Sequence, residues 1–117
     1  METHRLLIID DEPNLLDLVR RYLGRLGYQV ETCEDGLSAL ALLQAEPERF
    51  SMAVTDLSLP DVNGEELIDR MRKIRPGLPA IITSGYPYEP RAADIRFLQK
   101  PFLPQALAEA VENALKG

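Results

Sequence analysis

Short apolar runs alternate with amphipathic segments along the whole chain. The runs lie at residues 5–9, 28–32, 51–55, 79–83 and 95–99. Between them, apolar residues recur three or four positions apart over 13–26, after Gly36, around Leu67 and over 104–116. Runs of strand length that alternate with helical patterns indicate βα units and a parallel sheet. We therefore expect five strands, with residues 28–32 at an edge because their apolar and polar positions alternate.

The spacing also predicts which side of each helix faces the sheet. The first helix ends before Gly27, a residue typical of helix C-termini. The inward positions expected in the four helices are Leu15, Val19, Tyr22, Leu23 and Leu26, then Leu37, Leu40 and Leu43, then Leu67, Met71 and Ile74, and finally Leu107, Val111 and Leu115.

The connection between Ser84 and Lys100 is short for a crossover between parallel strands. Once residues 95–99 are assigned to a strand, about ten residues remain, and a parallel crossover normally needs about a dozen or more. Pro87 and Pro90 disfavour helix at the residues before them. We expect the helix here to be short or absent, of one turn at most and starting at Pro90.

Composition narrows the class of protein. A chain of 117 residues has the length of one domain, which we assign to residues 1–117. No long apolar stretch or leader pattern is present, which predicts a soluble, cytoplasmic protein without membrane contact. The net charge of −6 disfavours direct nucleic-acid binding by this domain, and the single cysteine, Cys33, excludes an internal disulfide.

Polar residues follow four of the five expected strands. Asp10 and Asp11 end the first, Asp56 the third, Ser84 the fourth and Lys100 the fifth. Ligands of open parallel sheets bind beyond the carboxyl ends of the strands. In the strand order 2-1-3-4-5, one of the common doubly wound orders, these side chains share one crevice.

Three carboxylates in one pocket repel each other and favour a bound cation. A pair about 4 Å apart is destabilised by roughly 4 kcal/mol at an effective dielectric constant near 20. An all-oxygen ligand set suits Mg²⁺ or Mn²⁺, and Mg²⁺ held by few carboxylates commonly binds phosphate oxygens as well. A metal bound beside Lys100 and Ser84 would suit phosphoryl transfer to an aspartate. We assign Asp56 as the nucleophile of this transfer.

Each residue also has an ordinary structural interpretation. Asp11 and Glu12 suit the start of a helix whose first residue is Pro13, and Asp56 and Ser84 suit a turn after a strand. A solvated lysine explains Lys100. The combination at four strand ends favours the functional interpretation.

The sequence resembles the response-regulator receiver domains of two-component signalling over essentially its whole length. The stretches that carry the resemblance are IIDDEP, EDGLSAL, TDLSLPDVNG, ITSG and FLQKPF. The resemblance implies a flavodoxin-like (βα)₅ fold. It also implies a regulatory phosphoacceptor domain that promotes only its own phosphorylation and dephosphorylation and is not otherwise an enzyme.

The resemblance assigns roles to individual residues. Asp56 accepts a phosphoryl group from a phosphohistidine on a sensor histidine kinase or a histidine phosphotransfer protein. Asp10, Asp11, Asp56 and the backbone carbonyl of Ser58 hold Mg²⁺. The remaining roles are a pairing of Lys100 with the phosphoryl group, a hydrogen bond from Ser84 to it, an aromatic rotamer change at Phe97 and a cis Lys100-Pro101 bond.

The stretch TSGYP at residues 83–87 resembles receivers of hybrid sensor kinases, and it also resembles a subgroup of receivers with Gly-Tyr after the fourth strand and a degenerate fourth helix. Either resemblance implies a phosphoryl relay or sink instead of a transcriptional switch, and the first implies fusion to a kinase or output domain. We expect the phosphorylation-dependent change to be concentrated in residues 84–96 and to be largely an ordering of that loop.

Three other functions fit the same fold class. A flavodoxin-type electron carrier needs a phosphate-binding loop where this chain has Asp10, Asp11 and Glu12, which repel phosphate. An aspartate-nucleophile phosphatase needs its nucleophile after the first strand and a general acid two residues later, where Glu12 instead suits a helix cap. The third alternative is a phosphorylation-independent interaction module, which a missing pocket residue would favour.

Overall fold

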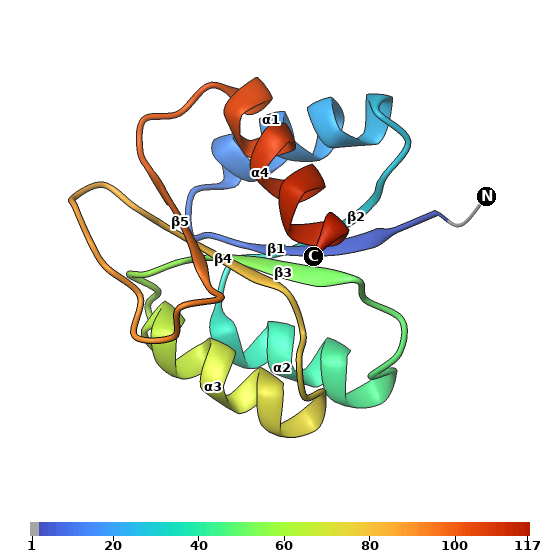
Figure 1. The fold of residues 1–117 in the computed structure, drawn as a ribbon, viewed down its shortest axis with the longest axis vertical. Helices are drawn as coiled ribbons and strands as arrows, with labels where there is room; N and C mark the ends of the chain where they lie inside the picture. The colour runs from blue at the N-terminus through green and yellow to red at the C-terminus, as the bar shows by residue number, and fades with distance from the viewer. Residues whose placement is uncertain (1–2) are drawn as a thin grey trace.

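The computed structural model describes residues 3–117 and contains one parallel sheet (Figure 1). Its strands have the order β2-β1-β3-β4-β5, which confirms the predicted doubly wound topology. The strands are β1 (Arg5–Ile9), β2 (Gln29–Cys33), β3 (Met52–Asp56), β4 (Ala80–Ser84) and β5 (Arg96–Gln99). The helices are α1 (Pro13–Arg25), α2 (Gly36–Ala45), α3 (Gly64–Ile74) and α4 (Pro104–Lys116).

The helices cover both faces of the sheet. In Figure 1, α1 and α4 lie on one side of the strands, and α2 and α3 lie on the other. Successive residues of a strand point to opposite faces, and β1 follows this rule. Leu6 and Ile8 pack in the core under α1 and α4, whereas Leu7 and Ile9 pack under α2 and α3. Burial on both faces explains why the central strands are continuous apolar runs.

In two helices the buried face agrees only in part with the predicted one: Val19, Leu23 and Leu43 are buried as expected, but one predicted position in each helix is exposed. In α1, Leu16 is buried although the spacing did not select it. Leu26 is 56% exposed because α1 ends at Arg25 and Leu26 lies beyond its last turn. In α2, Leu37 is also 56% exposed, whereas Ala39 and Leu43 are buried. The sequence of α2 is apolar nearly all round, so its periodicity does not select a face.

Close packing selects the buried face of α2. A Cβ atom on Gly36 would lie 2.3 Å from a methyl carbon of Val62, so only glycine fits at this contact. The carboxylate of Asp61 accepts hydrogen bonds from the backbone N–H groups of Gly36 and Leu37, both at 2.9 Å. These bonds hold the pKa of Asp61 below its usual range and fix the N-terminus of α2 to the loop after β3.

The segment between β4 and β5 contains no helix, which confirms the expected short or absent helix, although the turn expected to start at Pro90 is not formed. Residues 85–95 instead lie against α3. The Arg91 guanidinium pairs with Asp69 at 2.9 Å, and Asp94 pairs with Arg72 at 3.1 Å. These ion pairs attach the segment to α3, and its further ordering on phosphorylation stays a prediction. Among the described residues, no helix is long and apolar enough to cross a membrane.

Candidate functional site

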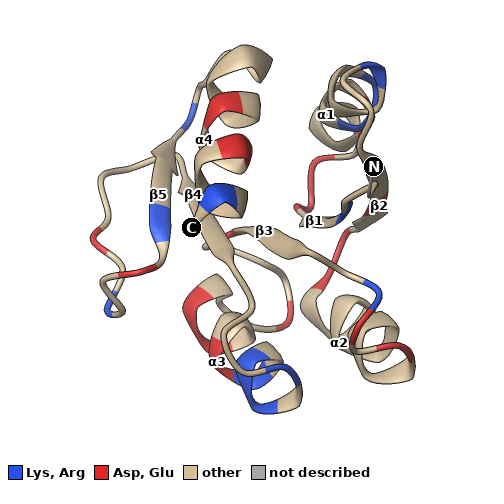
Figure 2. Cartoon of the chain, turned by 45° about the vertical axis from the view of Figure 1, so that its right-hand side comes forward, with Lys and Arg blue, Asp and Glu red and all other residues tan. Residues whose placement is uncertain are grey.

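The carboxyl ends of β1 and β3 bring three aspartates together. Asp10 and Asp11 follow β1 directly, and Asp56 is the last residue of β3. Each offers an oxygen that lies within 4.8 Å of those of the other two. The acidic stretch after β1 is visible as the red segment that connects β1 to α1 in Figure 2. The strand-end clustering predicted from sequence therefore exists.

The aspartates differ in burial. Asp10 and Asp56 are 4% and 7% exposed, whereas Asp11 is exposed. Burial raises the pKa of the Asp56 carboxyl above its ordinary value, and the negative charges of Asp10 and Asp11 act in the same direction. The Lys100 ammonium and the backbone N–H of Ser58 act against this rise but do not cancel it. The Asp56 anion is therefore short of stabilising positive charge.

Lys100 supplies the ammonium at this site. Its Nζ lies 2.7 Å from Asp10, 3.1 Å from Glu12 and 3.7 Å from Asp56. Burial disfavours the ammonium form, but the hydrogen bonds to Asp10 and Glu12 outweigh that effect and raise the pKa of Lys100. Lys100 therefore remains charged, and in this arrangement it engages Asp10 more closely than Asp56.

Backbone hydrogen bonds fix the relative positions of β3, β4 and β5 at the site. The Leu57 N–H donates to the Thr83 carbonyl at 2.8 Å, and the Lys100 N–H donates to the Ser84 carbonyl at 2.7 Å. Asp56 and Ser84 were expected just after their strands, but each is the last strand residue. Ser84 is 1% exposed, and its hydroxyl accepts a hydrogen bond from the Tyr86 N–H at 3.2 Å.

Phe97 and Ser58 lie at the margins of the site. Phe97 faces the same side of the sheet as Ile82 and is half-buried against Tyr88, with ring centroids 6.4 Å apart. Ser58 forms an isolated bridge with Asn63 in the loop after β3. The Lys100–Pro101 peptide bond is cis.

Glu12 does not act as the side-chain cap suggested by its position. It is the N-cap residue of α1, but its carboxylate makes no capping hydrogen bond and instead accepts one from Lys100. Asp10 satisfies the Glu12 N–H at 3.0 Å. The sequence carries no signal for this role, because Lys100 is 88 residues away from Glu12 along the chain.

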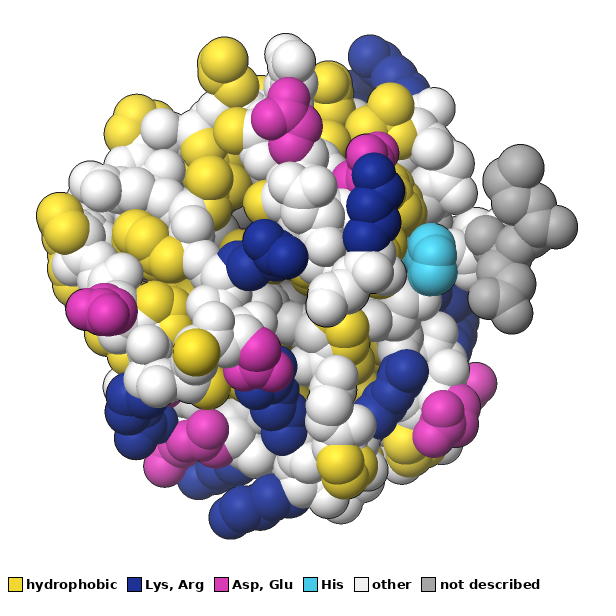
Figure 3. Space-filling model, viewed as in Figure 1, with side chains coloured by type: hydrophobic (Ala, Val, Ile, Leu, Met, Phe, Trp, Pro, Cys, Tyr) yellow, Lys and Arg dark blue, Asp and Glu magenta, His cyan; other side chains and the backbone are white. Residues whose placement is uncertain are grey.

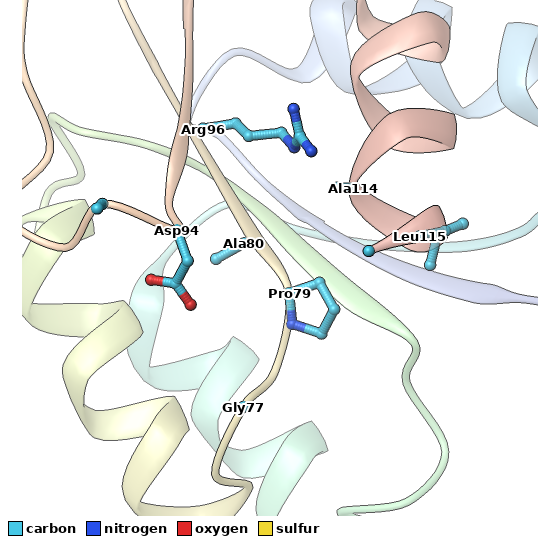
Figure 4. Close-up of a pocket in the computed structure, with 9 residues that line it drawn as sticks. Gly77, Pro79, Ala80, Asp94, Arg96, Ala114 and Leu115 are labelled. Atoms are coloured by element: carbon cyan, nitrogen blue, oxygen red, sulfur yellow. The ribbon is translucent and has the colours of Figure 1, made fainter.

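One surface groove is remote from the aspartates. This groove of about 480 Å³ lies at the opposite ends of β4 and β5, beside the last turn of α4 (Figure 4). Its lining combines small residues such as Gly77 and Ala80 with Arg96, whose side chain extends toward α4 in the figure. It contains none of the candidate site residues.

The aspartate cluster fits a hard divalent cation. The oxygens available as ligands belong to carboxylates. The single ammonium of Lys100 is shared among three carboxylates, those of Asp10, Glu12 and Asp56. The charge therefore remains negative around Asp56, whose carboxyl already has a raised pKa. An oxygen-only site with excess negative charge suits Mg²⁺ or Mn²⁺.

Comparisons with known proteins agree with this geometry. Residues 6–112 match the family described as the response regulator receiver domain. The chain belongs to this family. A CheY-like receiver domain protein from Methanospirillum hungatei is 32% identical, with a TM-score of 0.86 and coverage of 98% of this chain and 95% of that one. Phosphorelay signalling through a phosphoaspartate is the function of receiver domains.

Two other similar proteins show the range of contexts in which receivers occur. The receiver domain of the hybrid histidine kinase CckA is 28% identical, with a TM-score of 0.86 and coverage of 95% and 98% of the two chains. The transcriptional regulatory protein GlrR of Escherichia coli is 33% identical over 95% of this chain, which spans only 26% of GlrR.

Proposed function

We propose that Asp56 of this receiver accepts a phosphoryl group from a phosphohistidine donor in a reaction that depends on Mg²⁺. The proposal rests on one observation: Asp10, Asp11 and Asp56 lie together at the carboxyl ends of β1 and β3, beside the ammonium of Lys100. Asp56 suits the role of nucleophile because it ends the central strand, β3, and has a neighbouring charged donor in Lys100.

The proposed transfer forms one bond and breaks another. A carboxylate oxygen of Asp56 attacks phosphorus, the P–N bond of the phosphohistidine breaks, and its electron pair returns to the imidazole ring. Lys100 turns from Asp10 toward an oxygen of the transferred group, a movement of short range because Nζ already lies 3.7 Å from Asp56. The Ser84 hydroxyl donates a hydrogen bond to another of those oxygens.

The metal would be held by Asp10, Asp11, Asp56 and the backbone carbonyl of Ser58. When bound, Mg²⁺ neutralises charge on the carboxylates and on the phosphoryl oxygens. The three side chains have the required donor atoms, and the raised pKa of Asp56 indicates that added positive charge stabilises its anion.

The partners we propose are a sensor histidine kinase or a histidine phosphotransfer protein, both reached in the cytoplasm. Figure 3 shows hydrophobic side chains along the left edge of the molecule, where Figure 1 has the loops that follow β4 and β5. In these loops Tyr86 is 53% and Leu103 is 71% exposed, which leaves apolar surface for a docking protein. The match to part of GlrR and to the receiver of CckA supports fusion to an output or kinase domain.

The test uses a small phosphodonor such as acetyl phosphate. We expect the protein to take up phosphoryl groups with Mg²⁺ but not after removal of the metal by EDTA. The bond should be cleaved by hydroxylamine, as an acyl phosphate is, whereas a phosphate ester on Ser58 or Ser84 should resist. Phosphoryl uptake that is unchanged after EDTA treatment, or a product that resists hydroxylamine, would contradict the proposal.

A further inference from the structure

Glu65 is a buried carboxylate outside the aspartate cluster. It is the second residue of α3 and is only 2% exposed. Its Oε1 accepts hydrogen bonds from the Tyr88 hydroxyl and, at 3.0 Å, from the Arg91 N–H. A buried carboxylate is costly unless donors satisfy it, and here both hydrogen-bond donors belong to the segment between β4 and β5.

These bonds differ from the other attachments of residues 85–95. Two ion pairs also attach this segment, Arg91 with Asp69 and Asp94 with Arg72. In each pair at least one of the two side chains is largely exposed. Exposed pairs of this kind contribute little to stability. Glu65 is therefore the principal polar attachment of this segment to α3, and we call its bonds to Tyr88 and Arg91 the Glu65 clamp.

The Glu65 clamp is connected to the site at both ends. Gly64, the preceding residue, packs so closely on the carbonyl of Asp56 that a Cβ atom would lie 2.4 Å from it. At the other end, the Tyr88 ring packs on Phe97. Two residues before Tyr88, the Tyr86 N–H donates to the Ser84 hydroxyl, so the clamped segment also holds Ser84 in its present orientation.

We propose that the Glu65 clamp stabilises a resting arrangement in which the Tyr86 amide engages Ser84, and that the clamp loosens when Ser84 turns to a phosphoryl group on Asp56. Glu65 is thus a positioning residue for the switch, acting through Tyr88 and the segment it anchors. The inference rests on the function proposed above for Asp56 and Ser84. A weaker clamp lowers the free energy needed to reach the phosphorylated arrangement and so strengthens apparent binding of a phosphoryl mimic.

The test compares two tyrosine substitutions in the same segment. Tyr88→Phe keeps the ring on Phe97 but removes the hydroxyl that Glu65 accepts from. Tyr86→Phe is the matched control, because within residues 3–117 no hydrogen bond of the Tyr86 hydroxyl is found. Apparent affinity is measured with beryllofluoride and Mg²⁺. Loss of one hydrogen bond should strengthen beryllofluoride binding by Tyr88→Phe about fivefold and leave Tyr86→Phe unchanged.

A second readout follows the Arg91 amide without any mimic. Its hydrogen exchange should be faster in Tyr88→Phe than in wild type or Tyr86→Phe, and Glu65→Gln, which keeps an acceptor oxygen, should be intermediate. Equal affinities and equal exchange in the two tyrosine variants would overturn the clamp alone. Wild-type protein that binds no beryllofluoride would overturn the proposed function and, with it, the role of the clamp.

Discussion

Two glycine-to-alanine substitutions should change the stability of this receiver in opposite directions. Gly24 lies in the last turn of α1 on the exposed side, and a Cβ atom there meets nothing within 4 Å. Gly64 begins α3, and a Cβ atom there would lie 2.4 Å from the carbonyl oxygen of Asp56 and 3.0 Å from Cα of Leu57. Both neighbours of Gly64 are backbone atoms, which cannot move aside as a flexible side chain does.

The expected magnitudes follow from these contacts. Alanine favours helix over glycine by about 0.5–1 kcal/mol, so Gly24→Ala should raise the free energy of unfolding by about that amount. Overpacking typically costs about 1–3 kcal/mol, and for Gly64→Ala this should exceed the helical gain. Because the helical gain is common to both substitutions, the two variants should differ by the overpacking cost, roughly 1–3 kcal/mol, with the wild type between them.

Urea unfolding followed by circular dichroism measures both variants on one scale. Because the clash at Gly64 displaces the backbone of Asp56 and Leu57, Gly64→Ala should also slow phosphoryl uptake, whereas Gly24→Ala should not. Equal stability of the two variants would refute the close approach of α3 to the end of β3.

Two further changes test other parts of the structure. Asp61→Ala should lower the free energy of unfolding by about 1 kcal/mol at neutral pH in urea titrations, because the first two backbone N–H groups of α2 lose their acceptor. Since the pKa of Asp61 is lowered in the folded state, this stabilisation is full above the ordinary carboxyl pKa and is lost as the pH falls through the folded pKa. A difference in stability between wild type and Asp61→Ala that persists in acid would contradict this explanation. Mg²⁺ at about 100 times its dissociation constant should stabilise the wild type by about 2.7 kcal/mol, measured by thermal unfolding. Asp11→Ala should remove most of that gain, and an undiminished gain would exclude Asp11 as a ligand.

The sheet and its strand-end residues were predictable because local signals and topology agree. Apolar runs that end in Asp10 and Asp56 mark strand termini, and parallel pairing then places those termini at one edge. The pattern was less informative for α2, because a helix that is apolar nearly all round has no unique inward face. Its orientation depends on the contact between Gly36 and Val62, which are distant in sequence.

The tertiary roles of single acids were not predictable. Glu12, Asp61 and Glu65 all look like ordinary helix-start acids in the sequence. In the structure their partners are Lys100, the first amides of α2, and the segment between β4 and β5, respectively. Each partner lies more than twenty residues away, so only the folded chain shows which donor each carboxylate meets.

Intact mass after incubation with Mg²⁺ and acetyl phosphate tests the central claim most directly. Wild-type protein should gain the mass of one phosphoryl group, and Asp56→Asn, which keeps the shape of the side chain but removes its nucleophilic carboxylate, should gain none. No gain by the wild type, or an equal gain by Asp56→Asn, would contradict the assignment of Asp56 as the phosphoacceptor.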